Sequence, residues 1–277
     1  MNNTFNFKRF GKYLAYDLKS VWKEQRVFLV TYAIIPVITY VVTMFFTMIG
    51  QGFSMADLSH SGAGLPARLS IFFLVSVIFL LFFPSRTYGF ITDKAKGSAW
   101  IQLPASRLEK FASMMLISLV IIPTAFFCAY LLSDALVCLI DKGCGSSILS
   151  SWRDTDMASY VDGDKSFRVS GNGLWILANG VLQIVSVFLL GALTFKKNKV
   201  AKTILSLFVI SLVLSGVIGI IASSINLEAF GDGIQDWVLN HADNMDFWFN
   251  FWSNVELAVI VAGLGLWSWF KVRNIQH

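Results

Sequence analysis

Six long apolar stretches alternate with polar segments along this chain. Each holds about 20 mostly hydrophobic residues, the length that an α-helix needs to cross about 30 Å of hydrocarbon. The stretches cover residues 27–49, 69–90, 112–132, 174–193, 203–222 and 251–270. They predict an all-α integral membrane protein with a single transmembrane domain over residues 1–277. The first stretch is too long and lies too far from the start for a cleaved signal peptide.

The composition narrows the class further. Hydrophobic residues make up 56% of the 277 residues and charged residues only 14%, whereas an average soluble domain carries about a quarter charged residues. A soluble protein with so few charges could not cover its own surface. The composition therefore argues against a soluble enzyme, a disordered chain and a nucleic-acid binder, and favours a multi-pass membrane protein.

The basic residues divide unevenly between the two sides of the predicted membrane domain. Of the 22 Lys and Arg, 17 fall in four segments, which are residues 1–26, 86–111, 194–202 and 271–277. The other five fall in the three remaining loops, residues 50–68, 133–173 and 223–250. Because Lys and Arg near the ends of spans stay on the cytoplasmic side, we expect both termini to be cytoplasmic. A bacterial cytoplasmic membrane is the expected location.

Residues 5–25 precede the first span and form an amphipathic pattern. Apolar residues recur at spacings of three and four, at Phe7, Phe10, Leu14, Leu18 and Val21. Lysines follow the same spacing on another face, at Lys8, Lys12, Lys19 and Lys23. Such a helix lies in the headgroup layer with its lysines on anionic lipid. It is either a plain membrane anchor or an elbow helix that leads into the first span of a transporter.

The predicted cytoplasmic loop over 86–111 has a clear local pattern. Pro104 stops any preceding helix because its ring and missing N–H disfavour helical continuation. Ser106 and Glu109 match the S-x-x-E capping box just before an apolar run, so we expect the third span to begin as a capped helix near Ser106. The loop is either an ordinary connection or a docking surface for a cytoplasmic partner.

This loop resembles a known family. The segment reads Gly97-Ser-Ala-Trp-Ile-Gln-Leu-Pro-Ala-Ser-Arg-Leu-Glu-Lys-Phe111. It is similar to the segment after the second span of ABC transporter permeases of the type-2 (exporter) class, which often shows a Gly, a short apolar stretch and then Leu-Pro-x-Ser-Arg. The Phe7-Lys-Arg-Phe-Gly-Lys12 helix and the six-span plan also match that class.

The resemblance implies a function and a set of site residues. In that class, the loop after the second span carries a coupling helix that docks on the ATPase subunit. The matching positions of this chain are Lys94, Lys96, Trp100, Pro104, Arg107 and Glu109. The implied partners are a cytoplasmic ABC ATPase and a second permease copy, identical or related, in a membrane of lipid. No nucleic acid is expected, and the chain itself needs no cofactor because ATP would bind the partner.

The predicted spans contain almost no ionisable residues at depth. Since charges inside a bilayer usually mark proton relays and ion pathways, this absence argues against a proton-coupled secondary transporter.

Two polar patterns remain within the predicted spans. Asn179 and Gln183 share one face of the fourth span, where interhelical hydrogen bonding is favoured over substrate contact. Small residues recur along the fifth span at Ser211, Ser215, Gly219 and Ser223. A packing seam within the chain is favoured there over a dimer or pathway face.

The expected outer loops carry acidic and aromatic residues. The Asp154-Thr-Asp156 and Asp162-Gly-Asp164 pairs lack the spacing of a calcium loop, so a solvated acidic loop is favoured. Cys138 and Cys144 would lie on the oxidising side, where either a disulfide or two free thiols would fit. Residues 224–250 are rich in Trp and Phe, which favours short interfacial or re-entrant helices, or a simple aromatic belt.

Enzyme motifs are missing from the chain. There is no G-x-x-x-x-G-K-[ST] phosphate loop, no G-x-S-x-G and no H-E-x-x-H. We therefore expect no enzyme. The leading hypothesis is the permease subunit of an ABC exporter that forms the translocation path, with a lipid, a hydrophobic peptide or a drug as its cargo. The alternative is a non-transport membrane scaffold, assembly factor or sensor.

Overall fold

The computed structural model describes residues 5–51, 65–140, 147–151, 155–162, 165–171, 173–223 and 245–273. Helices account for most of this part of the chain. They are α1 (Phe7–Gln51), α2 (Leu65–Tyr88), the 3-10 turn η2 (Gly89–Thr92), α3 (Lys94–Gln102), α4 (Arg107–Leu116), the π-helical turn η3 (Ile117–Ile121), α5 (Ile122–Ile140), α6 (Ile148–Ser151), α7 (Gly173–Thr194), α8 (Lys199–Ser223) and α10 (Met245–Arg273). Two strands, β1 (Thr155–Asp162) and β2 (Lys165–Gly171), complete the described elements.

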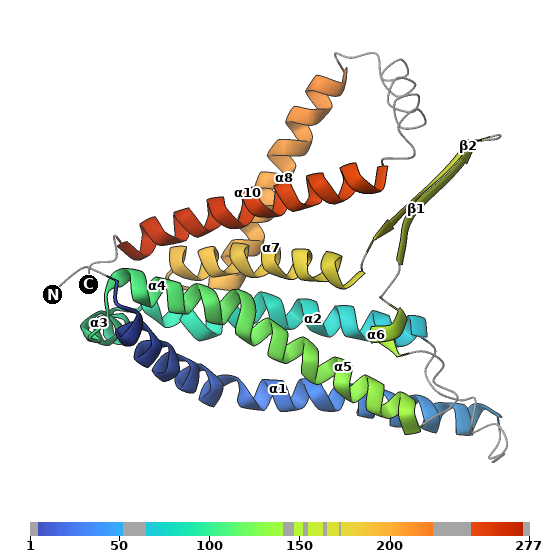
Figure 1. Cartoon of the computed structure of the whole chain (residues 1–277), viewed down its shortest axis with the longest axis horizontal. Coiled ribbons are helices and arrows are strands. Elements are labelled where there is room, and N and C mark those ends of the chain that lie inside the picture. Colours follow the sequence, from blue (N-terminus) through green and yellow to red (C-terminus); the bar gives the residue numbers. More distant parts are fainter. Residues whose placement is uncertain are drawn as a thin grey trace.

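Six helical segments are long and apolar enough to cross a membrane. They coincide with the six predicted spans, so the prediction of a six-span helical membrane protein is confirmed. They lie in α1, α2, α4 to α5, α7, α8 and α10. Figure 1 shows α1, α2, α4 to α5 and α7 running side by side, with α3, the start of α1 and the end of α10 at one end of this bundle. We call this end the α3 end, and the opposite one the hairpin end.

The β-hairpin at the opposite end was not predicted. Strands β1 and β2 pair antiparallel, with an irregularity in register between Asp156 and Ala158. They lie within residues 133–173, for which a solvated loop was expected from the sequence. The extended pairing is consistent with the local composition, because β1 and β2 contain Tyr, Val and Phe, which are enriched in strands.

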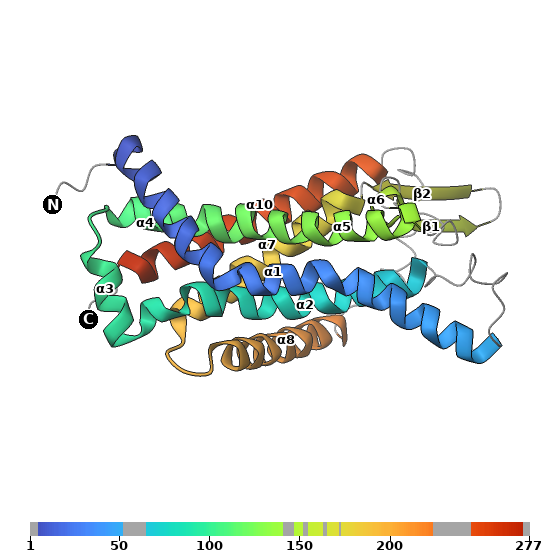
Figure 2. The same ribbon diagram turned by 90° about the horizontal axis from the view of Figure 1, so that it is seen from below.

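Helix α1 is longer than a single span requires. Its 45 residues measure about 68 Å at 1.5 Å per residue, against about 30 Å of hydrocarbon. The predicted elbow segment is thus continuous with the first span, and Figures 1 and 2 both show α1 changing direction after its N-terminal part. The inward face of that part carries Tyr13, Asp17 and Val21, which are buried in the protein.

In the elbow segment, the face that packs against the protein differs from the apolar face predicted from the sequence. The predicted apolar face begins at Phe7, which is 81% exposed, while Leu14 and Leu18 are half-buried against the core. The four lysines of the other face are exposed, as an amphipathic helix requires. The face centred on Tyr13 packs against other helices because α4 lies beside α1 and covers it.

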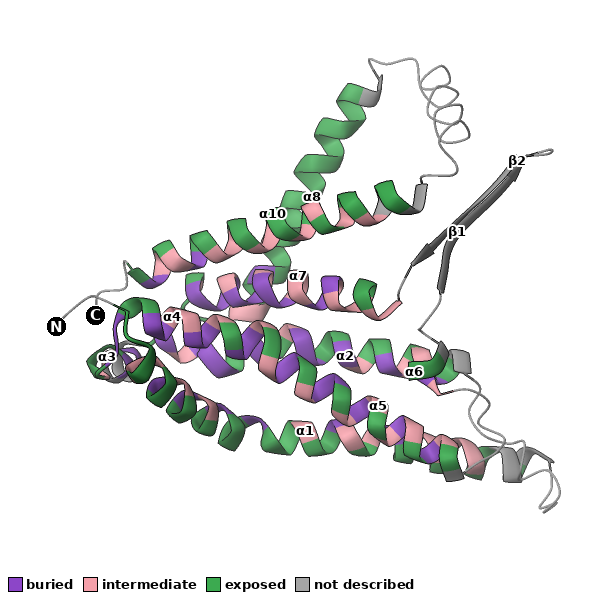
Figure 3. Ribbon diagram, in the orientation of Figure 1, coloured by how far each residue is buried: buried purple, intermediate pink, exposed green. Residues whose placement is uncertain are grey.

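An aromatic core holds the bundle together. Tyr32 of α1, Phe79 of α2 and Phe126 of α5 stack on one another, and Tyr130 packs beside Tyr32. The Tyr32 hydroxyl shares a 2.6 Å hydrogen bond with Ser76 of α2, which satisfies a polar group that burial would otherwise penalise. This aromatic part of the core lies where α1, α2 and α5 meet, and buried residues of α7 extend the core, as Figure 3 also shows.

Helix α8 departs from the bundle. None of the residues in its most apolar window is buried, and Figure 3 shows it exposed along most of its length. It is joined to α7 at its first turns, where Gly191 lets the two backbones approach closely. A Cβ built on Gly191 would overlap Thr203 Oγ1 and lie 2.9 Å from Thr203 Cβ. Glycine is needed there because any larger residue would push α8 away from α7.

Candidate functional site

Four residues at the α3 end join the starts of two helices, and we call them the N-terminal clamp. They are Asn6, Arg9, Ser106 and Glu109. The Asn6 side chain accepts hydrogen bonds from the backbone N–H groups of Lys8 and Arg9 and so caps α1. The Ser106 hydroxyl caps α4 by accepting a hydrogen bond from the Glu109 backbone N–H. The Glu109 carboxylate in turn accepts one from the Ser106 backbone N–H. The predicted capping box is confirmed.

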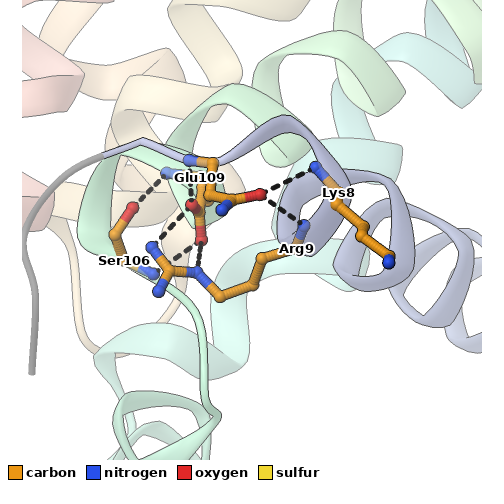
Figure 4. Close-up of polar contacts among 5 residues, drawn as sticks. Lys8, Arg9, Ser106 and Glu109 are labelled. Atoms are coloured by element: carbon orange, nitrogen blue, oxygen red, sulfur yellow. Dashed lines mark hydrogen bonds and ion pairs between the residues drawn. The ribbon is translucent and has the colours of Figure 1, made fainter.

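The Glu109 carboxylate is the centre of the clamp. Besides Ser106, it accepts a 2.9 Å hydrogen bond from the Asn6 backbone N–H. The Arg9 guanidinium donates two more, from Nε at 2.7 Å and from an Nη at 2.8 Å. Figure 4 shows these bonds converging on one carboxylate. Because the Glu109 side chain is fully buried and Arg9 is 36% exposed, the pair is only partly screened by water.

Helix α3 is held against the bundle by a second set of contacts. The Trp100 indole N–H donates to the Tyr13 hydroxyl of α1 at 3.1 Å. The Lys110 ammonium of α4 donates to the carbonyls of Trp100 and Ile101 at 2.8 and 2.9 Å. It thereby caps the C-terminal end of α3, where a positive charge is favourable. Pro104 follows two residues after α3 ends, as predicted.

Two further contacts fix the α3 end to the rest of the bundle. Asp17 of α1 accepts hydrogen bonds from Ser113 of α4 at 2.7 Å and from the Tyr88 hydroxyl of α2 at 3.3 Å. Arg107 donates to the backbone carbonyl of Arg273, the last residue of α10, at 2.7 Å. Any force applied to α3 would therefore reach α1, α2, α4 and α10 through side chains that are already in contact.

The predicted coupling residues divide into buried and exposed groups. Trp100 and Glu109 are buried, so they hold the region in place and offer little surface to a partner. Pro104 and Arg107 are exposed. Lys94 and Lys96 belong to the first turn of α3, but their side chains lie outside what the structure describes.

Two apolar side chains near these positions were not among the predicted coupling residues. Ile101 of α3 is 39% exposed and Leu108 of α4 is 46% exposed. Single exposed aliphatic residues are common on protein surfaces, so their place beside the predicted coupling residues, and not their exposure alone, makes these two candidates for contact with a partner. No local pattern marks these two residues, because an apolar residue in a short loop helix fits a core position equally well.

The polar residues predicted in the fourth and fifth spans differ in their burial. Asn179 is buried and donates to Ser253 of α10 at 3.3 Å, which is the interhelical bond favoured from the sequence. Gln183 is half-buried on the same helix. Ser211, Ser215 and Gly219 are exposed along α8, and the side chain of Ser223 lies outside the described part.

Among the residues that the structure describes, the exposed stripe on α8 is therefore no packing seam. Both serine hydroxyls bond to carbonyls of their own helix, and a Cβ on Gly219 would meet nothing within 4 Å. Contact with a second copy, or a place along a transport path, remains a prediction for these residues.

A buried ion pair at the hairpin end was also missed. Arg68 of α2 and Asp134 of α5 lie 2.8 Å apart, with side chains only 7% and 2% exposed. The second oxygen of Asp134 accepts the backbone N–H of Ile148 at 2.9 Å. Both residues were expected in outer loops, because each lies near the end of its span. The interior is thus less free of charge than predicted, although this pair lies near the helix ends.

The other features predicted on this side are only partly described. Cys138 is disulfide-bonded and Cys128 is a free thiol, while Cys144 lies outside the described residues. Asp154, Asp164 and residues 224–244 also lie outside the described residues. Phe247, Trp248, Phe251 and Trp252 start α10 and are exposed, as an aromatic belt at a membrane interface requires.

Comparisons with known proteins add no relative. No protein family, no curated protein and no solved structure matches the chain. We therefore infer its function from the sequence pattern and from the geometry of the α3 end.

Proposed function

We propose that this chain is the membrane-spanning permease subunit of an ABC-type exporter. A separate cytoplasmic ATPase docks on the α3 end, and a second permease copy completes the translocation path. ATP binding and hydrolysis take place on the partner chain. The α3 end faces the cytoplasm, in agreement with the excess of Lys and Arg in its segments.

The attachment of α3 is the observation that carries the proposal. A nine-residue helix outside the spans is anchored to α1 by Trp100 and to α4 by Lys110, while the clamp at Glu109 joins the starts of α1 and α4. Such a helix can transmit the motion of a docked partner to several spans at once. A two-state rocking of helical bundles is the kind of transition that this coupling would drive.

The surface available for docking consists of the exposed residues of α3 and the start of α4. Ile101 and Leu108 provide apolar contact, and Arg107 provides charge. This refines the prediction from the resemblance, in which Trp100 was a docking residue. In the folded chain Trp100 positions α3, and its neighbours meet the partner.

The first experiment is purification of the tagged protein from its native cells in mild detergent, followed by mass spectrometry of the bound proteins. A stoichiometric partner with a phosphate-binding loop is expected. The double variant Ile101→Ala/Leu108→Ala should lose the partner and its permease-stimulated ATP hydrolysis. Tyr16→Ala, which removes an exposed aromatic residue of α1, serves as the matched control and should retain both.

The alternative function has a distinct outcome in the same experiment. A membrane scaffold, assembly factor or sensor would co-purify with no ATPase, even after crosslinking through α3. In that case the double variant would change no ATP hydrolysis, and the transport proposal would be abandoned.

A further inference from the structure

A large cavity lies between α1 and α2, away from the docking surface. Its volume is about 760 Å³, within the range of 300–1,000 Å³ typical of ligand sites. Helix α5 contributes Phe126, and the turn before α8 together with its first residues closes one side. Figure 2 shows α1 and α2 lying next to each other with α8 beside them. We call this space the α1–α2 cavity.

The cavity is apolar along most of its length and polar at one end. Aromatic side chains form much of its wall, including Phe28, Tyr32, Phe79 and Phe82. Most of the polar residues gather at the α3 end, and they are Gln25, Ser85, Arg86, Asn198 and Lys199. Thr31 lies farther along α1, and its hydroxyl donates to the Val27 carbonyl of its own helix. This arrangement follows from the antiparallel course of α1 and α2. Gln25 hydrogen-bonds to Thr87 near the α3 end, whereas Tyr32 hydrogen-bonds to Ser76 farther from that end.

The length of the cavity matches one leaflet of a bilayer. Its lining on α2 runs from Val75 to Arg86, a span of eleven helical steps or about 16 Å. Half of a hydrocarbon core is about 15 Å. Phe28, Ile78 and Phe82 are exposed on its rim. Because these residues belong to membrane spans, the rim faces acyl chains, and an occupant can enter directly from the bilayer.

The polar end of the cavity carries a positive charge from Arg86. The Arg86 guanidinium lies over the Phe28 ring, 4.3 Å from its centroid, and forms no ion pair with any Asp or Glu of the described residues. Lys199 donates to the Gly89 carbonyl and to Thr92, and Asp93 is near enough to interact with it electrostatically. Of these two cations, Arg86 is therefore the one whose guanidinium N–H groups can bind an anion in the cavity.

A second polar group at this end lacks a partner. The buried hydroxyl oxygen of Ser85 has no hydrogen-bond partner within the described part of the chain. A buried hydroxyl without a partner is unfavourable. An ester or phosphate oxygen beside Arg86 would accept its hydrogen bond. The charge and the hydroxyl together point to an occupant with an anionic head and an apolar tail.

We propose that the α1–α2 cavity binds one anionic phospholipid from the leaflet on the α3 side. Its phosphate lies against Arg86 and Ser85, and one acyl chain fills the aromatic slot toward Val75. Basic pockets between spans on the cytoplasmic side are favourable places for acidic lipid headgroups. This lipid site is independent of the proposed transport function, because it depends only on the cavity, its charge and its place in the membrane.

The test is native mass spectrometry of the purified protein in a nonionic detergent, titrated with phosphatidylglycerol or with phosphatidylcholine of the same chains. We expect phosphatidylglycerol to bind about fivefold more tightly, since one cation near a membrane surface contributes about 1 kcal/mol. Arg86→Gln should abolish that preference and Arg86→Lys should retain it. Arg26→Gln, the same charge change at an exposed position of α1 outside the cavity, should leave it unchanged.

Further measurements distinguish a lipid site from a site for a free anion. Ile78→Trp, at the rim, should weaken both lipids because the ring obstructs the slot, and the thermal unfolding of each variant checks its fold. Glycerol phosphate, which has the anion without the chains, should not displace the lipid. The proposal is overturned if wild-type protein shows no preference, if Arg86→Gln and Arg26→Gln reduce it equally, or if glycerol phosphate competes.

Discussion

Replacing Glu109 with alanine would remove the acceptor that joins the starts of α1 and α4. Four N–H groups donate to this carboxylate, two from Arg9 and one each from the Asn6 and Ser106 backbones. Loss of half of a capping box destabilises by about 1 kcal/mol. Hydrogen bonds to a charged group contribute about 1.5–3 kcal/mol, reduced here because solvent screens the partly exposed Arg9. We expect Glu109→Ala to lower the free energy of unfolding by about 2–4 kcal/mol.

The ion-pair part of this loss can be isolated with a double-mutant cycle. The variants are Arg9→Met, Glu109→Gln and the pair, each unfolded reversibly in mixed micelles with rising sodium dodecyl sulfate and followed by tryptophan fluorescence. Because the two side chains contact each other, we expect a coupling energy of about 1–2 kcal/mol. Lys12→Met changes an exposed cation of the same helix and should cost less than about 0.5 kcal/mol.

Two results would refute this account of the clamp. One is a coupling energy near zero, which would mean that Arg9 and Glu109 act independently. The other is a loss for Lys12→Met as large as for Arg9→Met, which would mean that net charge on α1 matters and the specific pair does not.

Two other perturbations have expected outcomes. Gly191→Ala should destabilise the protein by about 1–3 kcal/mol because its methyl group would overlap Thr203. Gly180→Ala on the same helix meets open space and should be tolerated. Thermal unfolding in detergent compares the two variants, and equal shifts of their unfolding temperatures would contradict the close approach of α7 and α8. Asp134→Ala should cost about 3–5 kcal/mol because it removes the carboxylate from a buried Arg68, and the apolar pair Arg68→Met/Asp134→Leu should recover most of the loss in the same assay. If the apolar pair proves as unstable as Asp134→Ala, the loss does not come from an unpaired charge on Arg68.

The spans, the end of α3 and the start of α4 were determined by the sequence alone. Their signals are local: runs of apolar residues long enough for a bilayer, a proline that ends a helix, and a serine and a glutamate three residues apart. The uneven distribution of Lys and Arg is equally visible without a structure. Local patterns survive folding because backbone hydrogen bonds in a membrane must be satisfied within each helix.

The tertiary structure alone decided which residues meet. Arg9 and Glu109 are 100 residues apart and Arg68 and Asp134 are 66 apart, so no spacing along the chain could pair them. The same packing buries Trp100, exposes Ile101 and Leu108 beside it, and leaves the small residues of α8 facing outward. Side-chain contact depends on where whole helices lie relative to one another. The hydrophobic pattern of one helix shows which residues are apolar, while the arrangement of its neighbours decides whether they face protein, lipid or a partner.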